Sequence, residues 1–161
     1  MMIAELMLPE LDREMTLTRK VLEQVPEDKL DWRADDKLHT LGWNANHLAE
    51  IVGWTKFIVE QDVFDVAPAD GSAYQAPSLG DPAEILQAFD ENVAAARAAI
   101  ASASDETMAK LWTMKAGEQT LMTLSKGECL RTWVLNHTVH HRAILSVYLR
   151  MLGVEGAGVY G

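Results

Sequence analysis

The stretch that most constrains the fold lies near the C-terminus and reads Arg131-Thr132-Trp133-Val134-Leu135-Asn136-His137-Thr138-Val139-His140-His141-Arg142. At helical period, one stripe through this segment carries Leu130, Val134, His137, His141, Ile144, Tyr148 and Leu152. An amphipathic helix turns such a stripe toward a core, so both stripe histidines are predicted to project to the same buried side. Buried imidazoles are costly unless each ring has a partner, and a bound metal ion satisfies two rings at once. The pair His137 and His141 therefore predicts half of a metal site.

A third histidine lies on the inner stripe of another predicted helix. Thr40 is a suitable N-cap for a helix that runs to about Gln61. The inner stripe of that helix carries His47, Ile51, Trp54 and Ile58. Metal sites in helix bundles are built from side chains on facing helices, so His47 is predicted to join His137 and His141. Three neutral imidazoles suit zinc, nickel, iron or cobalt, and they leave a coordination position open for water or substrate.

The alternative is that each histidine is a hydrogen-bonded core residue. That interpretation would be favoured for one histidine on an apolar stripe, but three histidines on two stripes favour the metal site. An HxxxH pair alone is a weak signal, because it lacks the glutamate of the metalloprotease motif. His140 is one residue away from the paired positions, so it is expected to flank the site rather than bind the metal.

Three further residues are candidates for the same site. Glu50 follows His47 by three residues and could orient a ligand imidazole or act as a base, with simple solvation as the alternative. Arg142 could bind a substrate carboxylate, although a surface ion pair is an equal alternative. Trp43 could line a substrate pocket, with core packing as its alternative.

Four amphipathic helices account for most of the chain. Apolar periodicity and end signals place them at about 3–24, 40–61, 81–103 and 125–153. Residues 27–39 and 62–80 have no periodicity and are predicted as connections, while residues 111–123 fit either a short hairpin or a loop. The sequence thus predicts an all-α fold, an antiparallel-type four-helix bundle with long connections, in one domain over residues 1–161.

Composition narrows the possible partners and location. The chain of 161 residues has a net charge of −10 and no basic cluster, which disfavours nucleic acid and anionic membranes as partners. The lone Cys129 excludes an intrachain disulfide and a CxxC motif, and it is predicted to be a small buried hydrophobe. Without a signal peptide or an apolar run of ~20 residues, the protein is expected in the cytoplasm.

Two segments resemble the DinB-like family of four-helix-bundle proteins. The C-terminal segment is Asn136-His137-Thr138-Val139-His140-His141-Arg142, followed by residues 145–153 and Tyr160-Gly161. The other segment is Thr40-Leu41-Gly42-Trp43, which precedes His47. The resemblance implies that His47, His137 and His141 bind zinc or nickel, and that the protein is a homodimer. It also implies transfer of an external low-molecular-weight thiol to a small-molecule substrate. Two departures from the family are Ala143-Ile144, where Gly-Gln is common, and the tail Glu155-Gly156-Ala157-Gly158 in place of a proline-bearing one.

Two other functions fit the same residues. A metal-dependent hydrolase would use a metal-activated water, with Glu50 as its base. A non-catalytic metal-binding module of a stress response would use the metal mainly to join two helices. The chain offers no catalytic cysteine of its own, which fits a thiol supplied from outside.

Overall fold

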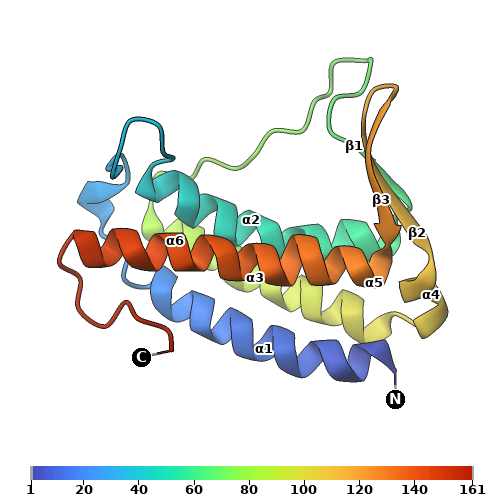
Figure 1. The fold of residues 1–161 in the computed structure, drawn as a ribbon, viewed down its shortest axis with the longest axis horizontal. Helices are drawn as coiled ribbons and strands as arrows, with labels where there is room; N and C mark the ends of the chain where they lie inside the picture. The colour runs from blue at the N-terminus through green and yellow to red at the C-terminus, as the bar shows by residue number, and fades with distance from the viewer. Residues whose placement is uncertain (1, 161) are drawn as a thin grey trace.

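Long helices lie side by side in the computed structural model, which describes residues 2–160 (Figure 1). They are α1 (Ile3–Leu22), α2 (Leu41–Glu60), α3 (Pro82–Ser102) and a C-terminal rod. The rod joins α5 (Lys126–Cys129), a π-helical segment (Leu130–Asn136) and α6 (His137–Met151). A 3₁₀ turn (Glu27–Lys29) follows α1, and the short helix α4 (Asp105–Ala109) follows α3. Gly161, which closes the C-terminal motif, lies outside the described residues.

The helix ends follow the local sequence signals. The Thr40 side chain accepts a hydrogen bond from the backbone N–H of Trp43 and caps α2. Asp81 caps α3 ahead of Pro82, and Ser125 forms a reciprocal capping box with Glu128. The observed bounds therefore lie within two residues of those predicted for the four helical segments.

The all-α prediction is wrong, because a three-stranded mixed sheet stands at one end of the bundle (Figure 1). Strands β2 (Leu111–Ala116) and β3 (Gln119–Ser125) form an antiparallel hairpin, the option that residues 111–123 allowed. Strand β1 (Val63–Asp65) pairs with β2 in parallel, so the segment predicted as a loop begins with a strand. A three-residue strand is too short to show alternation, and its pairing partner lies 50 residues further along the chain.

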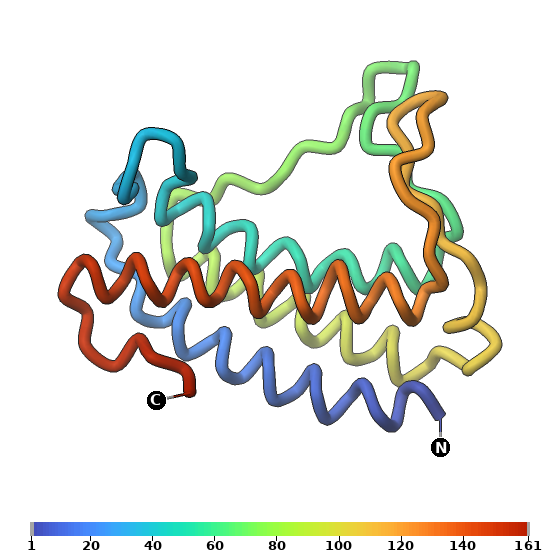
Figure 2. The backbone as a smooth tube through the Cα atoms, viewed as in Figure 1, coloured from blue at the N-terminus to red at the C-terminus, as the bar shows by residue number. Residues whose placement is uncertain are grey.

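The long connection after β1 is tied to the bundle and to the sheet. In Figure 2 it runs back along the bundle from the sheet to the start of α3. At the sheet end, the Asp65 carboxylate accepts a hydrogen bond from the backbone N–H of Gly117, where the hairpin turn needs a positive φ of 59°. Near α3, the Asn46 side chain exchanges two hydrogen bonds with the backbone of Leu79, at 2.8 and 3.0 Å. The connection therefore has a defined path over α2.

Helix α2 lies at the centre of the packing and is buried on most of its sides. It packs against α3 and α6, while α1 packs against the same two helices. Leu48, Ile51 and Ile58 are fully buried among residues of the other helices, including Phe89 and Leu145. Polar residues on α2 that are also buried, such as Glu50, therefore need specific partners. Across the described residues, no helix combines the length and apolar character required to cross a membrane.

Candidate metal centre

The three predicted histidines meet between α2 and α6. His47 comes from the second turn of α2, and His137 and His141 come from successive turns of α6. The Nε2 atom of His137 lies 3.1 Å from Nε2 of His141 and 3.4 Å from Nε2 of His47. One ligand atom from each ring lies within 4.8 Å of the others. The structure therefore brings together all three residues that the two apolar stripes selected.

Hydrogen bonds at the opposite ring nitrogens orient two of these imidazoles. Nδ1 of His47 lies 2.9 Å from Glu50 Oε2, and a carboxylate can only accept, so His47 donates. Nδ1 of His141 lies 3.2 Å from Asn44 Oδ1, while the amide group of Asn44 donates to the Thr40 carbonyl at 2.9 Å. That second bond sets the amide orientation, so His141 also donates through Nδ1. Both Nε2 atoms then present lone pairs to the shared space.

The donor set fits a divalent transition metal. Convergent lone pairs repel one another unless a cation lies between them. A tetrahedral zinc ion, with bonds of about 2.0–2.1 Å to nitrogen, would separate its ligand nitrogens by about 3.3 Å. The two measured separations bracket that value. The three histidines could therefore hold one metal ion, with His47, His137 and His141 as its ligands.

The surroundings of His137 and His141 keep these two rings in the neutral form that metal binding requires. Burial lowers the pKa of His141 to about 3, and repulsion from His47 and His137 adds to this effect. Burial also lowers the pKa of His137, again with repulsion from His47. At neutral pH these two imidazoles are therefore uncharged, and their lone pairs are available to a metal.

Glu50 acts on the centre through His47. Burial alone would raise its pKa, but hydrogen bonds from His47 and Tyr74 outweigh burial and lower it. The Tyr74 hydroxyl donates to Glu50 Oε1 at 2.5 Å, so both carboxylate oxygens are engaged. Burial raises the pKa of Tyr74 to about 12, and the hydrogen bond to Glu50 contributes to the shift. Of the roles proposed for Glu50, the geometry favours orienting the imidazole over acting as a base.

Aromatic side chains surround the centre. The Trp43 ring stacks on His47 with 4.6 Å between centroids, and it also stacks on His39 with 3.6 Å between centroids. Trp54 lies 6.0 Å from His47 and 6.1 Å from His137, between ring centroids. Trp43 is 36% exposed, so part of its ring faces solvent. The side of the centre next to Trp43 is therefore both aromatic and accessible.

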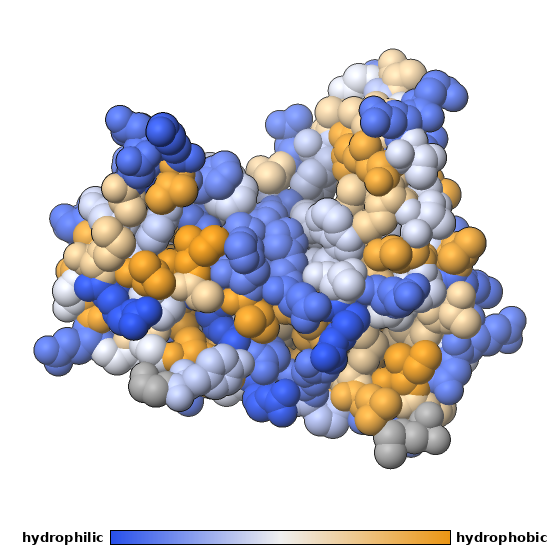
Figure 3. All heavy atoms as spheres, in the orientation of Figure 1, coloured by the Kyte–Doolittle hydropathy of each residue, from blue (hydrophilic) through white to orange (hydrophobic). Residues whose placement is uncertain are grey.

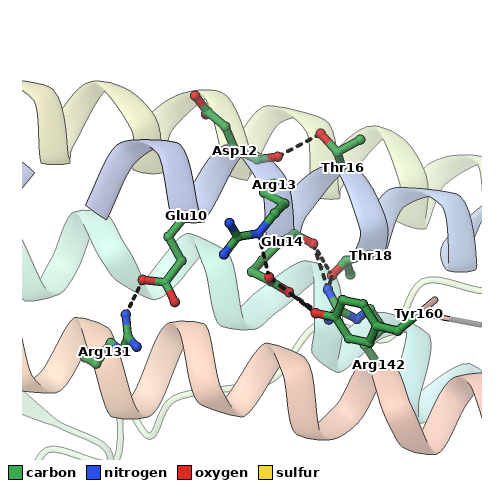
Figure 4. Close-up of polar contacts among 9 residues, drawn as sticks. All are labelled: Glu10, Asp12, Arg13, Glu14, Thr16, Thr18, Arg131, Arg142 and Tyr160. Atoms are coloured by element: carbon green, nitrogen blue, oxygen red, sulfur yellow. Dashed lines mark hydrogen bonds and ion pairs between the residues drawn. The ribbon is translucent and has the colours of Figure 1, made fainter. Parts of the chain in front are cut away.

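Arg142 does not lie beside the three histidines, and its guanidinium is occupied by other residues of the chain. Its side chain is 1% exposed and points toward α1, where Nη2 pairs with Glu14 Oε2 at 2.7 Å (Figure 4). Nη2 also donates to the Tyr160 hydroxyl at 2.9 Å, and Nη1 donates to the Thr18 hydroxyl at 3.3 Å. Arg142 follows His141 directly, and one residue along a helix is a rotation of about 100°, so the two side chains leave on different faces.

Two residues that matter for the centre were missed from the sequence. Asn44 lies three residues before His47, and this spacing on one helix could have identified it as a neighbour of the ligands. Tyr74 lies in the long connection, where no periodicity marks which side chains turn inward. His140 is exposed beside His141, with 4.9 Å between ring centroids, and it is not among the convergent ligand atoms.

A hollow in the surface lies between the end that carries the sheet and the opposite end of the bundle (Figure 3). Hydrophilic residues gather at the centre of this face, over the middle of the helices. Fold and site together define a helix-bundle protein with an added sheet and a three-histidine centre that could hold a metal ion.

The chain belongs to the DinB superfamily, whose family model matches residues 10–145. A DinB-like protein from Bacillus subtilis has a similar structure, with a TM-score of 0.66 at 12% identity and 91% of each chain covered. A putative DinB family member from Exiguobacterium sibiricum also gives a TM-score of 0.66, at 22% identity, covering 95% of this chain and 93% of the other. At these identities the likeness establishes the fold alone. No curated protein matches the chain.

Proposed function

We propose that this protein is a metal-dependent thiol S-transferase, which joins an external low-molecular-weight thiol to a small electrophilic substrate. The observation that carries the proposal is the convergence of three imidazole nitrogens beside a partly exposed aromatic side chain. A zinc or nickel ion held by His47, His137 and His141 would supply positive charge that lowers the pKa of a thiol and favours its thiolate.

The chain itself does not offer the nucleophile. Cys129 is fully buried, and burial raises its pKa to about 12, so it stays a thiol at neutral pH. A thiol from outside therefore has to provide the sulfur. In the reaction, its proton passes to solvent, the sulfur forms a bond to the electrophilic carbon, and the leaving group departs with the electron pair of the broken bond.

The residues of the chain prepare the site for this step. Glu50 and Asn44 hold the rings of His47 and His141, so the ligand nitrogens are aligned before any metal or substrate arrives. Trp43 provides a flat, partly exposed wall beside His47. The hydrolase alternative needs Glu50 as a base, and both of its oxygens already accept hydrogen bonds.

The test is a thiol-transfer assay on protein purified without an affinity tag and loaded with zinc or nickel. Glutathione, cysteine and other small thiols are each offered with benzyl chloride or iodoacetamide, and the thioether product is measured. We expect thioether formation that is faster than without protein and that is lost in His137→Ala. Turnover that needs no added thiol would indicate hydrolysis instead.

A second measurement separates the transferase from a non-catalytic metal module. If the metal only joined α2 to α6, a chelator should remove most of the folding free energy. The transferase proposal expects a folded but inactive protein after chelation, recorded by circular dichroism and by activity after metal is restored. Unfolding on chelation, with no turnover by the loaded protein, would favour the structural role.

A further inference from the structure

An apolar cavity of about 150 Å³ lies between the bundle and the sheet. Its wall combines residues of α2, the sheet and the C-terminal rod, among them Trp54, Phe57, Phe64, Trp112, Cys129 and Trp133. These residues are far apart in the sequence, and β1 and β2 bring Phe64 and Trp112 to the end of the bundle. The added sheet therefore has a specific consequence, because it closes an aromatic chamber against the helices.

The chamber shares its wall with the histidine centre. Trp54 lines the chamber, and its ring lies 6.0 and 6.1 Å from those of His47 and His137, between centroids. Trp133 also lines the chamber, with its ring 5.9 Å from that of His137. Tyr74, another wall residue, donates its hydroxyl to Glu50, which holds His47. No histidine among the described residues lines the chamber itself, so a group bound there would reach the centre past these shared side chains.

The size and character of the chamber define what it can bind. An apolar cavity of about 150 Å³ in a protein core stays dry and takes up benzene. The wall here is almost wholly apolar and rich in aromatic rings, which pack well against another ring. Close packing normally removes voids of this size, because the lining atoms lose their contacts. The Cys129 thiol in the wall is buried and protonated, so the chamber offers binding rather than chemistry.

We propose that the chamber binds a phenyl-sized apolar group of the electrophile and thereby places the adjacent reacting carbon at the histidine centre. This proposal deepens the transferase function and rests on it. For benzyl chloride, the sulfur of the thiol forms a bond to the benzylic carbon, and its proton goes to solvent. The carbon–chlorine bond breaks, and chloride leaves with the electron pair. Substrates with a compact aryl group are therefore preferred over small polar electrophiles.

The first arm of the test measures binding without chemistry. Fluorobenzene is titrated into the metal-loaded protein and followed by fluorine NMR. Cys129→Leu fills part of the chamber, while Cys129→Ala removes the same thiol and leaves the space open. We expect the wild type and Cys129→Ala to bind fluorobenzene. The affinity of Cys129→Leu for fluorobenzene should be lower by about tenfold or more. Metal content and circular dichroism confirm that each variant is loaded and folded.

A second filling variant keeps the test decisive if Cys129→Leu does not fold. Val66→Phe adds a ring from the connection after β1, which forms another part of the wall. Absence of fluorobenzene binding to the wild type would overturn the proposal. Unchanged binding in the filled variant would overturn it as well.

The second arm measures turnover with two electrophiles. In the filled variant, kcat/KM for benzyl chloride should fall about tenfold or more, while kcat/KM for iodoacetamide should change less than about twofold. Equal losses of kcat/KM for benzyl chloride and iodoacetamide would contradict the proposal that the chamber selects aryl substrates. If the wild type transferred thiol to neither electrophile, the transferase function itself would fail, and the fluorobenzene titration would still show whether the chamber binds aryl groups.

Discussion

Glu50 connects the metal centre to the rest of the protein. One of its oxygens accepts from Nδ1 of His47 and the other from the Tyr74 hydroxyl. Glu50 is 6% exposed, so water cannot easily replace either contact. A negatively charged acceptor on the far side of a ligand imidazole makes the ring a better donor to a metal. Glu50 is therefore a positioning residue, and its effect should be seen in metal affinity.

Replacing Glu50 tests this role at the scale of one side chain. Glu50→Gln keeps the size of the residue and removes its charge, so we expect the affinity for zinc to fall about 10–100-fold. Competition with a chromophoric chelator measures the affinity. The matched control is Glu60→Gln, which makes the same change at the exposed end of α2 and should leave the affinity unchanged. Equal affinities for wild type and Glu50→Gln would contradict the role.

At the scale of elements, α6 serves two functions on two faces. One face carries His137 and His141 toward α2, and another carries Arg142 toward α1. The guanidinium of Arg142 meets Glu14 and the Tyr160 hydroxyl, so the C-terminal tail joins the same contact (Figure 4). Buried charges of this kind depend on their partners, because no water replaces a missing one.

Loss of the Glu14 charge should therefore destabilise the protein strongly. Glu14→Gln leaves Arg142 buried without its carboxylate, and we expect the free energy of unfolding to fall by about 3–5 kcal/mol. Asp12→Asn, also on α1, breaks an exposed ion pair with Arg97 and should cost no more than about 1 kcal/mol. Urea denaturation of the metal-free proteins measures both values. Similar losses in the free energy of unfolding for the two variants would contradict a special role for the buried pair.

The same contact predicts how stability depends on pH. Burial alone would raise the pKa of Glu14, but hydrogen bonds from Arg142 and Tyr160 outweigh it and hold the pKa below its ordinary value of 4.5. Between the folded and the ordinary pKa of Glu14, the unfolded chain binds more protons at this group than the folded protein does. The free energy of unfolding therefore falls as the pH falls through this range. The stabilisation is complete above the ordinary value and is lost as the pH drops through the folded one.

Comparing wild type with Glu14→Gln isolates this effect. The difference in their free energies of unfolding should be constant above about pH 5 and should shrink below about pH 4.5. Urea denaturation across this range, on metal-free protein, gives the difference at each pH. A difference that stays constant down to pH 3, or grows, would show that Glu14 is not held as a carboxylate by Arg142.

On the scale of the whole molecule, patterns within single segments of the sequence predicted the features that lie on one helix. The three histidines, the caps at Thr40, Asp81 and Ser125 and the helix bounds follow from spacing within continuous segments. The features that the sequence did not predict depend on contacts between segments that are distant in sequence. Strand β1 exists because β2 pairs with it, and Tyr74 turns inward because Glu50 accepts from its hydroxyl.

The aromatic chamber is the clearest case of a feature that no single segment encodes. Trp54, Trp112 and Trp133 each fit an ordinary core position when considered alone. Only the docking of the sheet on the bundle places them around one space beside the histidines. For Arg142 the sequence left a substrate carboxylate and a surface ion pair as alternatives, whereas in the structure its partner is Glu14, a buried carboxylate 128 residues away in the sequence.

The most direct test of the central claim is the metal content of protein purified without an affinity tag. Elemental analysis should find about one equivalent of a divalent transition metal in the wild type. His140→Ala, which alters the exposed neighbour of the ligands, should retain that equivalent, and His137→Ala should lose most of it. Equal metal in wild type and in a folded His137→Ala variant would contradict a centre built from His47, His137 and His141.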